Sequence, residues 1–247
     1  MIIETFNLTY FLTLLVTAGV IVLLTFLAKN KSENYKRKML LSICYSNAIL
    51  WVIYKFWLAF GKFGIPDTYS FDIWTELPLH LCNISLILVP IGIHFKKNGI
   101  LAYGFFIAPL GAFMAYTFPS VGFTGLNIFY PHMLGYYITH LLIIVVGVLL
   151  VTLGFFKPTF KKIPSMFLTA FLLSFGAFLI NLFIRGVFNA PANYFYACEP
   201  EGISLLEVFW GIIPIPYVYL VFAIAILGVY TVITTLPFYL YDKKNKK

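Results

Sequence analysis

The stretch MLGYYITHLLIIVVGVLLVTLGFF, from Met133 to Phe156, decides how this sequence is interpreted. It contains no Asp, Glu, Lys or Arg residue, and its apolar side chains follow one another without regular alternation. A helix needs about 20 apolar residues to cross the roughly 30 Å hydrocarbon core of a bilayer. A strand of a membrane barrel would instead alternate over about ten residues. The stretch therefore predicts a transmembrane helix.

Six further apolar blocks have the length of a membrane span, and the third carries prolines but is bounded by charged residues. The blocks are Leu8–Ala28, Met39–Phe60, Leu77–Phe95, Ile100–Thr117, Phe167–Ile184 and Ile212–Leu240. The whole chain is 61% hydrophobic and 11% charged, whereas average globular usage is about 45–50% and about 25%. This composition excludes an ordinary cytosolic enzyme, a disulfide-stabilised secreted protein and a disordered chain. It predicts an all-α polytopic membrane protein, with residues 1–247 forming one domain of seven transmembrane helices.

The positions of the basic residues predict the orientation of these spans. Most of the 17 Lys and Arg residues follow the first, third, fifth and seventh blocks, and most of the acidic residues lie on the other side. Positively charged loops stay in the cytoplasm. We therefore expect a multi-pass protein of the cell membrane with its N-terminus outside and its C-terminus in the cytoplasm. The net charge of +8 is a sign of this topology and does not indicate a nucleic-acid partner.

Polar and ionisable side chains inside a membrane are costly and often mark function. In this sequence they are concentrated in four spans, at levels that the predicted orientation places in the outer half of the membrane. Tyr136 and His140 share a helix face with His132, because residues four apart lie one above the other. The remaining residues of this group are Lys55, His80, Cys82, Asn83, Asn181 and Arg185. Together they predict a polar cavity that opens toward the outer leaflet.

Several of these residues also have structural interpretations. The long side chains of Lys55 and Arg185 can reach the membrane interface while their stems remain in apolar surroundings. Asn47 and Asn181 can donate hydrogen bonds between helices, and Cys44 is expected to pack as a small apolar residue.

Cys82 and His140 favour a chemical role. A thiol becomes a strong nucleophile when a base takes its proton, and a histidine at similar depth on another helix would supply that base. The pair suggests acyl transfer through a thioester. A metal site is the rival interpretation, but His132 and His140 lie about 12 Å apart along one helix, and neither HExxH nor CxxC occurs.

Three stretches resemble the YwaF-like bacterial integral membrane proteins and their eukaryotic relatives, the transmembrane protein 164 group. They are ELPLHLCNISLILVPIG from Glu76, YYITHLLIIVVGVLL from Tyr136, and NLFIRGVFNAPANYFYACEPEGISLLEVFWGIIPIPYVYL from Asn181. The last stretch departs from the family pattern at Glu199, where a lysine is usual, and at Ile213 and Ile215.

The resemblance implies a cysteine-dependent acyltransferase that moves a fatty acyl chain between phospholipids without a cofactor or metal. Carried over by motif, its nucleophile and base become Cys82 and His140. Asn83 or His80 would then stabilise the oxyanion, while Lys55 and Arg185 would bind a lipid phosphate. Tyr136 and Asn181 would line the cavity, and Asn193 and Tyr194 would belong to a loop covering it. The alternative is a transporter or binding protein for lipids or small molecules, without covalent chemistry at the cysteine.

Overall fold

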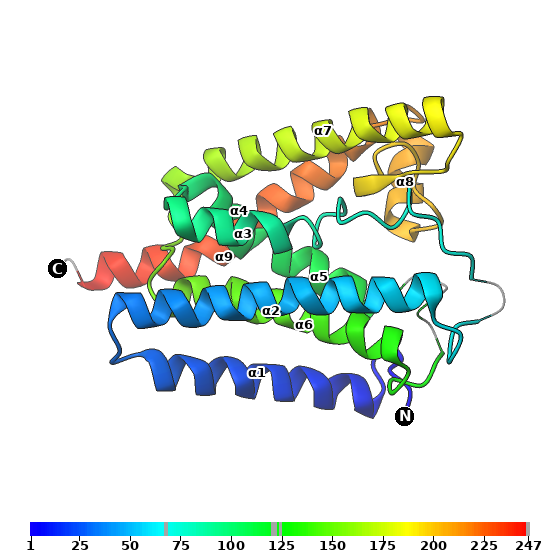
Figure 1. Cartoon of the computed structure of the whole chain (residues 1–247). Coiled ribbons are helices and arrows are strands. Elements are labelled where there is room, and N and C mark those ends of the chain that lie inside the picture. The colour runs from blue at the N-terminus through cyan, green and yellow to red at the C-terminus, as the bar shows by residue number, and fades with distance from the viewer. Residues whose placement is uncertain (67–68, 120–122, 124, 246–247) are drawn as a thin grey trace. The chain divides into compact units, whose positions relative to one another are not determined.

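A computed structural model describes residues 1–66, 69–119, 123 and 125–245, and regular secondary structure in this part of the chain is helical. The helices, drawn in Figure 1, are α1 (Leu8–Ala28), α2 (Glu33–Phe60), α3 (Ser85–Phe95), α4 (Asn98–Phe106), α5 (Ala108–Thr117), α6 (Pro131–Thr152), α7 (Ile163–Phe188), α8 (Ser204–Ile212) and α9 (Val221–Asn245). Short 3₁₀ turns occur at Phe160–Lys162, Tyr194–Tyr196 and Val218–Leu220. Side-chain caps begin the first two helices, since Asn7 accepts a hydrogen bond from the backbone N–H of Tyr10, and Ser32 accepts one from Tyr35.

Six helical segments of the described chain are long and apolar enough to cross a membrane. They are Leu8–Ala28, Glu33–Phe60, Asn98–Thr117, Pro131–Thr152, Phe160–Phe188 and Val218–Asn245. Helices α1, α7 and α9 expose many large apolar side chains, as lipid-facing helices do. The prediction of an all-α, multi-pass membrane protein is therefore confirmed.

The third predicted span, Leu77–Phe95, differs from the structure, because regular helix begins only at Ser85. Residues 73–84 form a series of turns instead. Pro78 has no backbone N–H to donate and disfavours helical conformation in the residue before it. The resulting α3 is short, and Cys82 lies in the last turn before it rather than inside a continuous helix.

The last span also begins later than Ile212, the residue at which α8 ends. Pro214 and Pro216 follow α8, and neither can donate the backbone hydrogen bond that a continuing helix needs. The chain resumes helical structure at Val218 and continues as α9. Within the fourth predicted span, Pro109 separates α4 from α5 in the same way.

The described chain divides into two compact units. The first comprises residues 1–72 and 82–156, and the second comprises residues 73–81 and 157–247. In the first unit α6 is the central helix, with contacts to α1, α2, α4 and α5. In the second unit the loop after α7 returns to pack against α7, and α8 packs against the turn that precedes α9. The prediction of one seven-helix domain stays a prediction.

Glycines allow α6 to approach its neighbours closely. A Cβ atom on Gly135 would lie 2.1 Å from Cβ of Tyr54 on α2. A Cβ atom on Gly147 would lie 2.2 Å from Cγ of Pro109, at the beginning of α5. Small residues at helix contacts are a common device in membrane proteins, and here they fix the two helices that flank the polar part of α6.

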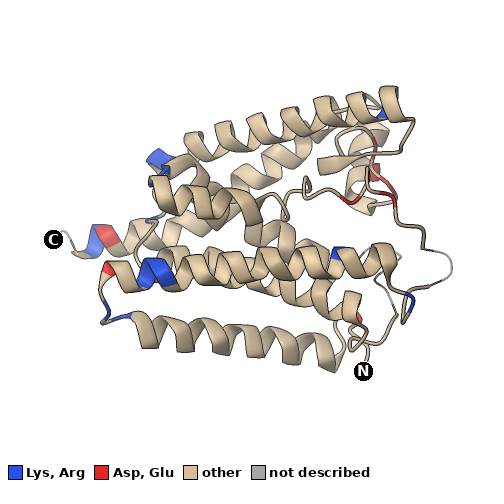
Figure 2. Ribbon diagram, in the orientation of Figure 1, with Lys and Arg blue, Asp and Glu red and all other residues tan. Residues whose placement is uncertain are grey.

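Charged residues gather where helices turn, and Figure 2 shows a group of basic residues at the beginning of α2. In the first unit Lys96 pairs with Glu33 at 3.2 Å, joining the α3–α4 turn to the α1–α2 turn. In the second unit Lys157 pairs with Asp242 at 2.7 Å. Each pair joins two segments that the charge pattern assigns to the cytoplasmic side, so the assignment is consistent within each unit.

Candidate functional site

The first unit brings Cys82 and His140 into contact. Sγ of Cys82 lies 3.4 Å from Nε2 of His140, which is hydrogen-bond distance for a sulfur atom. The cysteine lies just before α3 and the histidine in the first half of α6. Both are buried, with 7% and 2% of their surface exposed. The thiol and the imidazole, 58 residues apart in sequence, thus meet where water is largely excluded.

The second ring nitrogen of His140 fixes how the imidazole is used. Nδ1 lies 2.7 Å from the backbone oxygen of Tyr136. A carbonyl only accepts hydrogen bonds, so Nδ1 carries the proton and the neutral ring presents an unprotonated Nε2 to Cys82. The Tyr136 ring lies 4.4 Å from the imidazole, centre to centre, and its hydroxyl donates to the backbone oxygen of Ala115 on α5 at 2.7 Å. The histidine is therefore held in the form that accepts a proton.

The turn before α3 holds Cys82 from the other side. The hydroxyl of Ser85 donates to the backbone oxygen of Cys82 at 2.5 Å, and the N–H of Leu86 donates to that of Asn83 at 3.0 Å. These bonds place the thiol at the N-terminus of α3, whose dipole favours negative charge nearby. Burial acts in the opposite direction and disfavours a free thiolate. A base in direct contact is therefore the feature that nucleophilic chemistry requires here.

Two other groups approach this pair. The amide oxygen of Asn83 lies 3.8 Å from Sγ of Cys82. On α2, Asn47 donates to the backbone oxygen of Thr139 at 3.1 Å, one residue before His140. This bond confirms that Asn47 links neighbouring helices, as its alternative interpretation expected.

Lys55 lies on α2, further toward the helix end that the charge pattern places outside. Its Nζ is 5.1 Å from the ring centre of Tyr54 and 5.9 Å from that of Trp51. Both distances are within the range of cation–π attraction. The ammonium group is thus oriented by two aromatic rings of its own helix.

In the second unit Asn181 and Tyr194 form a two-point contact. The side chain of Asn181 donates to the backbone oxygen of Tyr194 and accepts from its backbone N–H, both at 2.9 Å. The Tyr194 hydroxyl donates to the backbone oxygen of Trp74 at 2.6 Å and accepts from the N–H of Leu77 at 3.1 Å. The ring of His80 packs edge-on against Tyr194, with 5.2 Å between centres. These contacts connect the loop after α7 to residues 73–81.

The same loop uses Arg185 and Asn193 to satisfy its own polar groups. Arg185 donates to the backbone oxygen of Ala192 at 2.7 Å and forms an ion pair with Glu199. Asn193 donates to Glu201 at 2.9 Å and accepts from the backbone N–H of Cys198 at 2.9 Å. Desolvation raises the pKa of the Glu201 carboxyl. The guanidinium expected to meet a lipid phosphate is therefore already partnered by a carboxylate.

The ten residues selected from the sequence divide equally between the two units. Those in the first unit are Lys55, Cys82, Asn83, Tyr136 and His140, and those in the second are His80, Asn181, Arg185, Asn193 and Tyr194. Sequence reasoning missed Ser85, which anchors the turn carrying Cys82. A serine three residues after the cysteine, at the beginning of an apolar helical run, is a signal that was available.

The described residues include no group of three or more His, Cys, Asp and Glu side chains arranged to hold a metal ion. A sequence model described as the TMEM164 family matches residues 3–234. A search of curated proteins and a search of solved structures found no match.

Proposed function

The chain belongs to the TMEM164 family, and we propose that it is a phospholipid acyltransferase of the cell membrane with Cys82 as nucleophile and His140 as base. The observation that carries the proposal is the 3.4 Å contact between Sγ and Nε2, with Nδ1 tied to a carbonyl. The three stretches quoted above further support a place among the YwaF-like members. The proposed partners are membrane phospholipids, and the chemistry needs neither metal nor cofactor.

The first half-reaction transfers the acyl chain to the protein. Nε2 of His140 takes the thiol proton as Sγ attacks the ester carbonyl of a donor phospholipid. The new S–C bond forms, the ester C–O bond breaks, and the imidazolium returns its proton to the departing alkoxide. Asn83, next to the nucleophile, is the proposed donor to the oxyanion through its amide Nδ2.

The second half-reaction reverses these roles. A lysophospholipid hydroxyl gives its proton to Nε2 and attacks the thioester carbon. The new ester bond forms, the S–C bond breaks, and the proton returns to the cysteine. Because one nitrogen acts as base and acid in turn, a neutral imidazole of fixed tautomer is the state that the cycle needs.

Residues of the second unit are proposed to act on the substrate headgroup. Lys55 in the first unit and Arg185 in the second are the proposed phosphate ligands, the latter through N–H groups not occupied by Glu199. His80, Asn181, Asn193 and Tyr194 hold the loop after α7 in shape, so their proposed effect on substrate binding is indirect.

The test is transfer of a labelled acyl chain between phospholipids in vesicles containing the reconstituted protein. We expect Cys82→Ala, Cys82→Ser and His140→Ala each to reduce transfer by at least about 10³-fold, because the nucleophile and its base act as a unit. The matched control is Cys198→Ala, which removes another buried thiol, and it should keep wild-type transfer. If Cys82→Ala retains transfer, the covalent mechanism is wrong, and binding or transport without covalent chemistry becomes the better account.

A further inference from the structure

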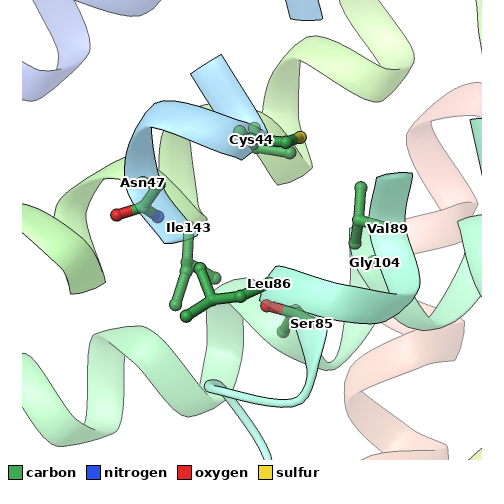
Figure 3. A pocket seen from close by; sticks show the side chains of 9 residues that line it. Cys44, Asn47, Ser85, Leu86, Val89, Gly104 and Ile143 are labelled. Carbon is green, nitrogen blue, oxygen red and sulfur yellow. The ribbon is translucent and has the colours of Figure 1, made fainter. Parts of the chain in front are cut away.

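A small cavity lies one helical turn beyond Cys82 and His140 in the first unit. Figure 3 shows Cys44 and Asn47 of α2, Leu86 and Val89 of α3, and Ile143 of α6 around it. Ser85, whose hydroxyl holds the backbone oxygen of Cys82, also lines it. Ile143 follows His140 by three residues on the same side of α6, about 4.5 Å further along the helix axis. The cavity is thus the space next to the reacting pair on the side toward the membrane interior.

The walls of this cavity suit hydrocarbon. Leu86, Val89, Ile143 and Val146 supply most of the side-chain surface, and no charged residue lines it. Its volume is about 10 Å³, near the smallest space that can hold a single water molecule. Apolar cavities of this kind remain dry and accept apolar guests. A methylene chain fits this chemistry, whereas a headgroup or a polar acceptor does not.

Two walls of the cavity are interrupted by proline. Pro90 lies inside α3 and cannot donate to the backbone oxygen of Leu86, and Pro109 follows the break between α4 and α5. The helical hydrogen-bond ladder is therefore already open on both sides of the cavity. Widening it requires side-chain rotation and small helix shifts, and no regular backbone hydrogen bond has to be broken at these points.

We propose that this cavity receives the part of the acyl chain nearest the thioester on Cys82, and that its walls determine which chains are transferred. The inference rests on the proposed acyltransferase function and adds a site for the chain to it. Val146 is the position at which this selection is best tested, because it lines the cavity. Its neighbour Val145 is buried to a similar degree, with 2% of its surface exposed against 6%, but does not line the cavity.

The experiment presents reconstituted protein with an equimolar mixture of phosphatidylglycerols that differ only in acyl chain length and branching. Mass spectrometry then measures the ratio of transferred chains, a ratio that does not depend on how much protein is folded. Val146→Ala should shift the ratio toward longer and branched chains by about fourfold, the factor that corresponds to about 0.8 kcal/mol for one buried methylene. Val146→Met should shift it the other way, and Val145→Ala and Val145→Met should leave it unchanged. An unchanged ratio in the Val146 variants, or an equal shift in the Val145 variants, overturns the proposal.

A second measurement keeps the outcome decisive if the wild type transfers no chain at all. A phosphatidylglycerol whose acyl chain carries a diazirine near its ester is irradiated in vesicles with the same proteins. Labelling of the α3 and α6 peptides around Leu86 and Ile143, reduced by Val146→Met but not by Val145→Met, supports the chain site even though the proposed function has failed. Labelling that is absent there, or that does not respond to Val146→Met, shows that the cavity does not receive the chain.

Discussion

Replacing Gly135 with alanine should force α2 and α6 apart at the level of the Cys82–His140 pair. The added Cβ would lie 2.1 Å from Cβ and 2.6 Å from Cγ of Tyr54. Carbon atoms at their optimal separation are about 3.5–4.0 Å apart, so the helices must move by more than about 1 Å. No side-chain rotation relieves the contact, because Cβ is fixed to the backbone and Tyr54 is buried.

We expect this change to cost about 3 kcal/mol, the upper part of the range for overpacked cores. The matched control is Gly19→Ala in α1, where an added Cβ would meet no atom within 4 Å. That variant should be neutral or more stable by up to about 1 kcal/mol, because alanine favours helix over glycine. Unfolding by sodium dodecyl sulfate in mixed micelles, followed by circular dichroism, measures both values.

The same displacement should affect the site. Gly135 precedes Tyr136, whose backbone oxygen orients His140, and a misplacement of about 1 Å can reduce catalysis about 10²-fold. Tyr54→Ala should not rescue Gly135→Ala, because alanine retains the Cβ atom that makes the contact. Equal midpoints for Gly135→Ala and Gly19→Ala would refute the idea that this glycine sets the distance between α2 and α6.

Three further predictions concern other parts of the chain. His132→Phe should raise stability by about 1 kcal/mol, because neither nitrogen of this buried ring has a hydrogen-bond partner among the described residues; a lower unfolding midpoint would indicate that the ring nitrogens are used. Glu201→Gln should raise the unfolding temperature at neutral pH, by less than about 1 kcal/mol. Desolvation raises the folded-state pKa of this carboxyl, so folding favours its protonated form, stability falls as the pH rises through its titration, and the gain should vanish below about pH 4. A reporter fused after Lys247 should be cytoplasmic and one inserted at Glu199 external, and the reverse result would contradict the orientation inferred from charge.

Most of the spans could be predicted because length and continuous apolarity decide them. Met133–Phe156 carries that information locally, and α6 occupies most of it. The beginnings of α3 and α9 could not be placed as well, because apolar composition continues through turns that Pro78, Pro214 and Pro216 create. Hydrophobicity measures whether a segment enters the membrane, whereas the proline positions decide where helix can form.

The proximity of Cys82 and His140 was predictable from their similar depth in neighbouring spans. The orientation of the imidazole was not, since it depends on a backbone oxygen that every residue has. The contacts of Asn181 with Tyr194 were equally hidden, because they join two residues through a loop whose backbone includes the left-handed conformation at Phe195. A sequence pattern identifies such polar residues as unusual without revealing that they hold one another.

The covalent intermediate is the most direct test of the central claim. Wild-type protein is incubated with phospholipid vesicles, separated from lipid under denaturing conditions, and weighed intact by mass spectrometry. The account predicts an added mass equal to one fatty acyl chain, removed by neutral hydroxylamine as a thioester is, and absent from Cys82→Ala and His140→Ala. An adduct that persists in Cys82→Ala, or transfer by the wild type with no adduct under any quenching condition, would contradict acyl transfer through Cys82.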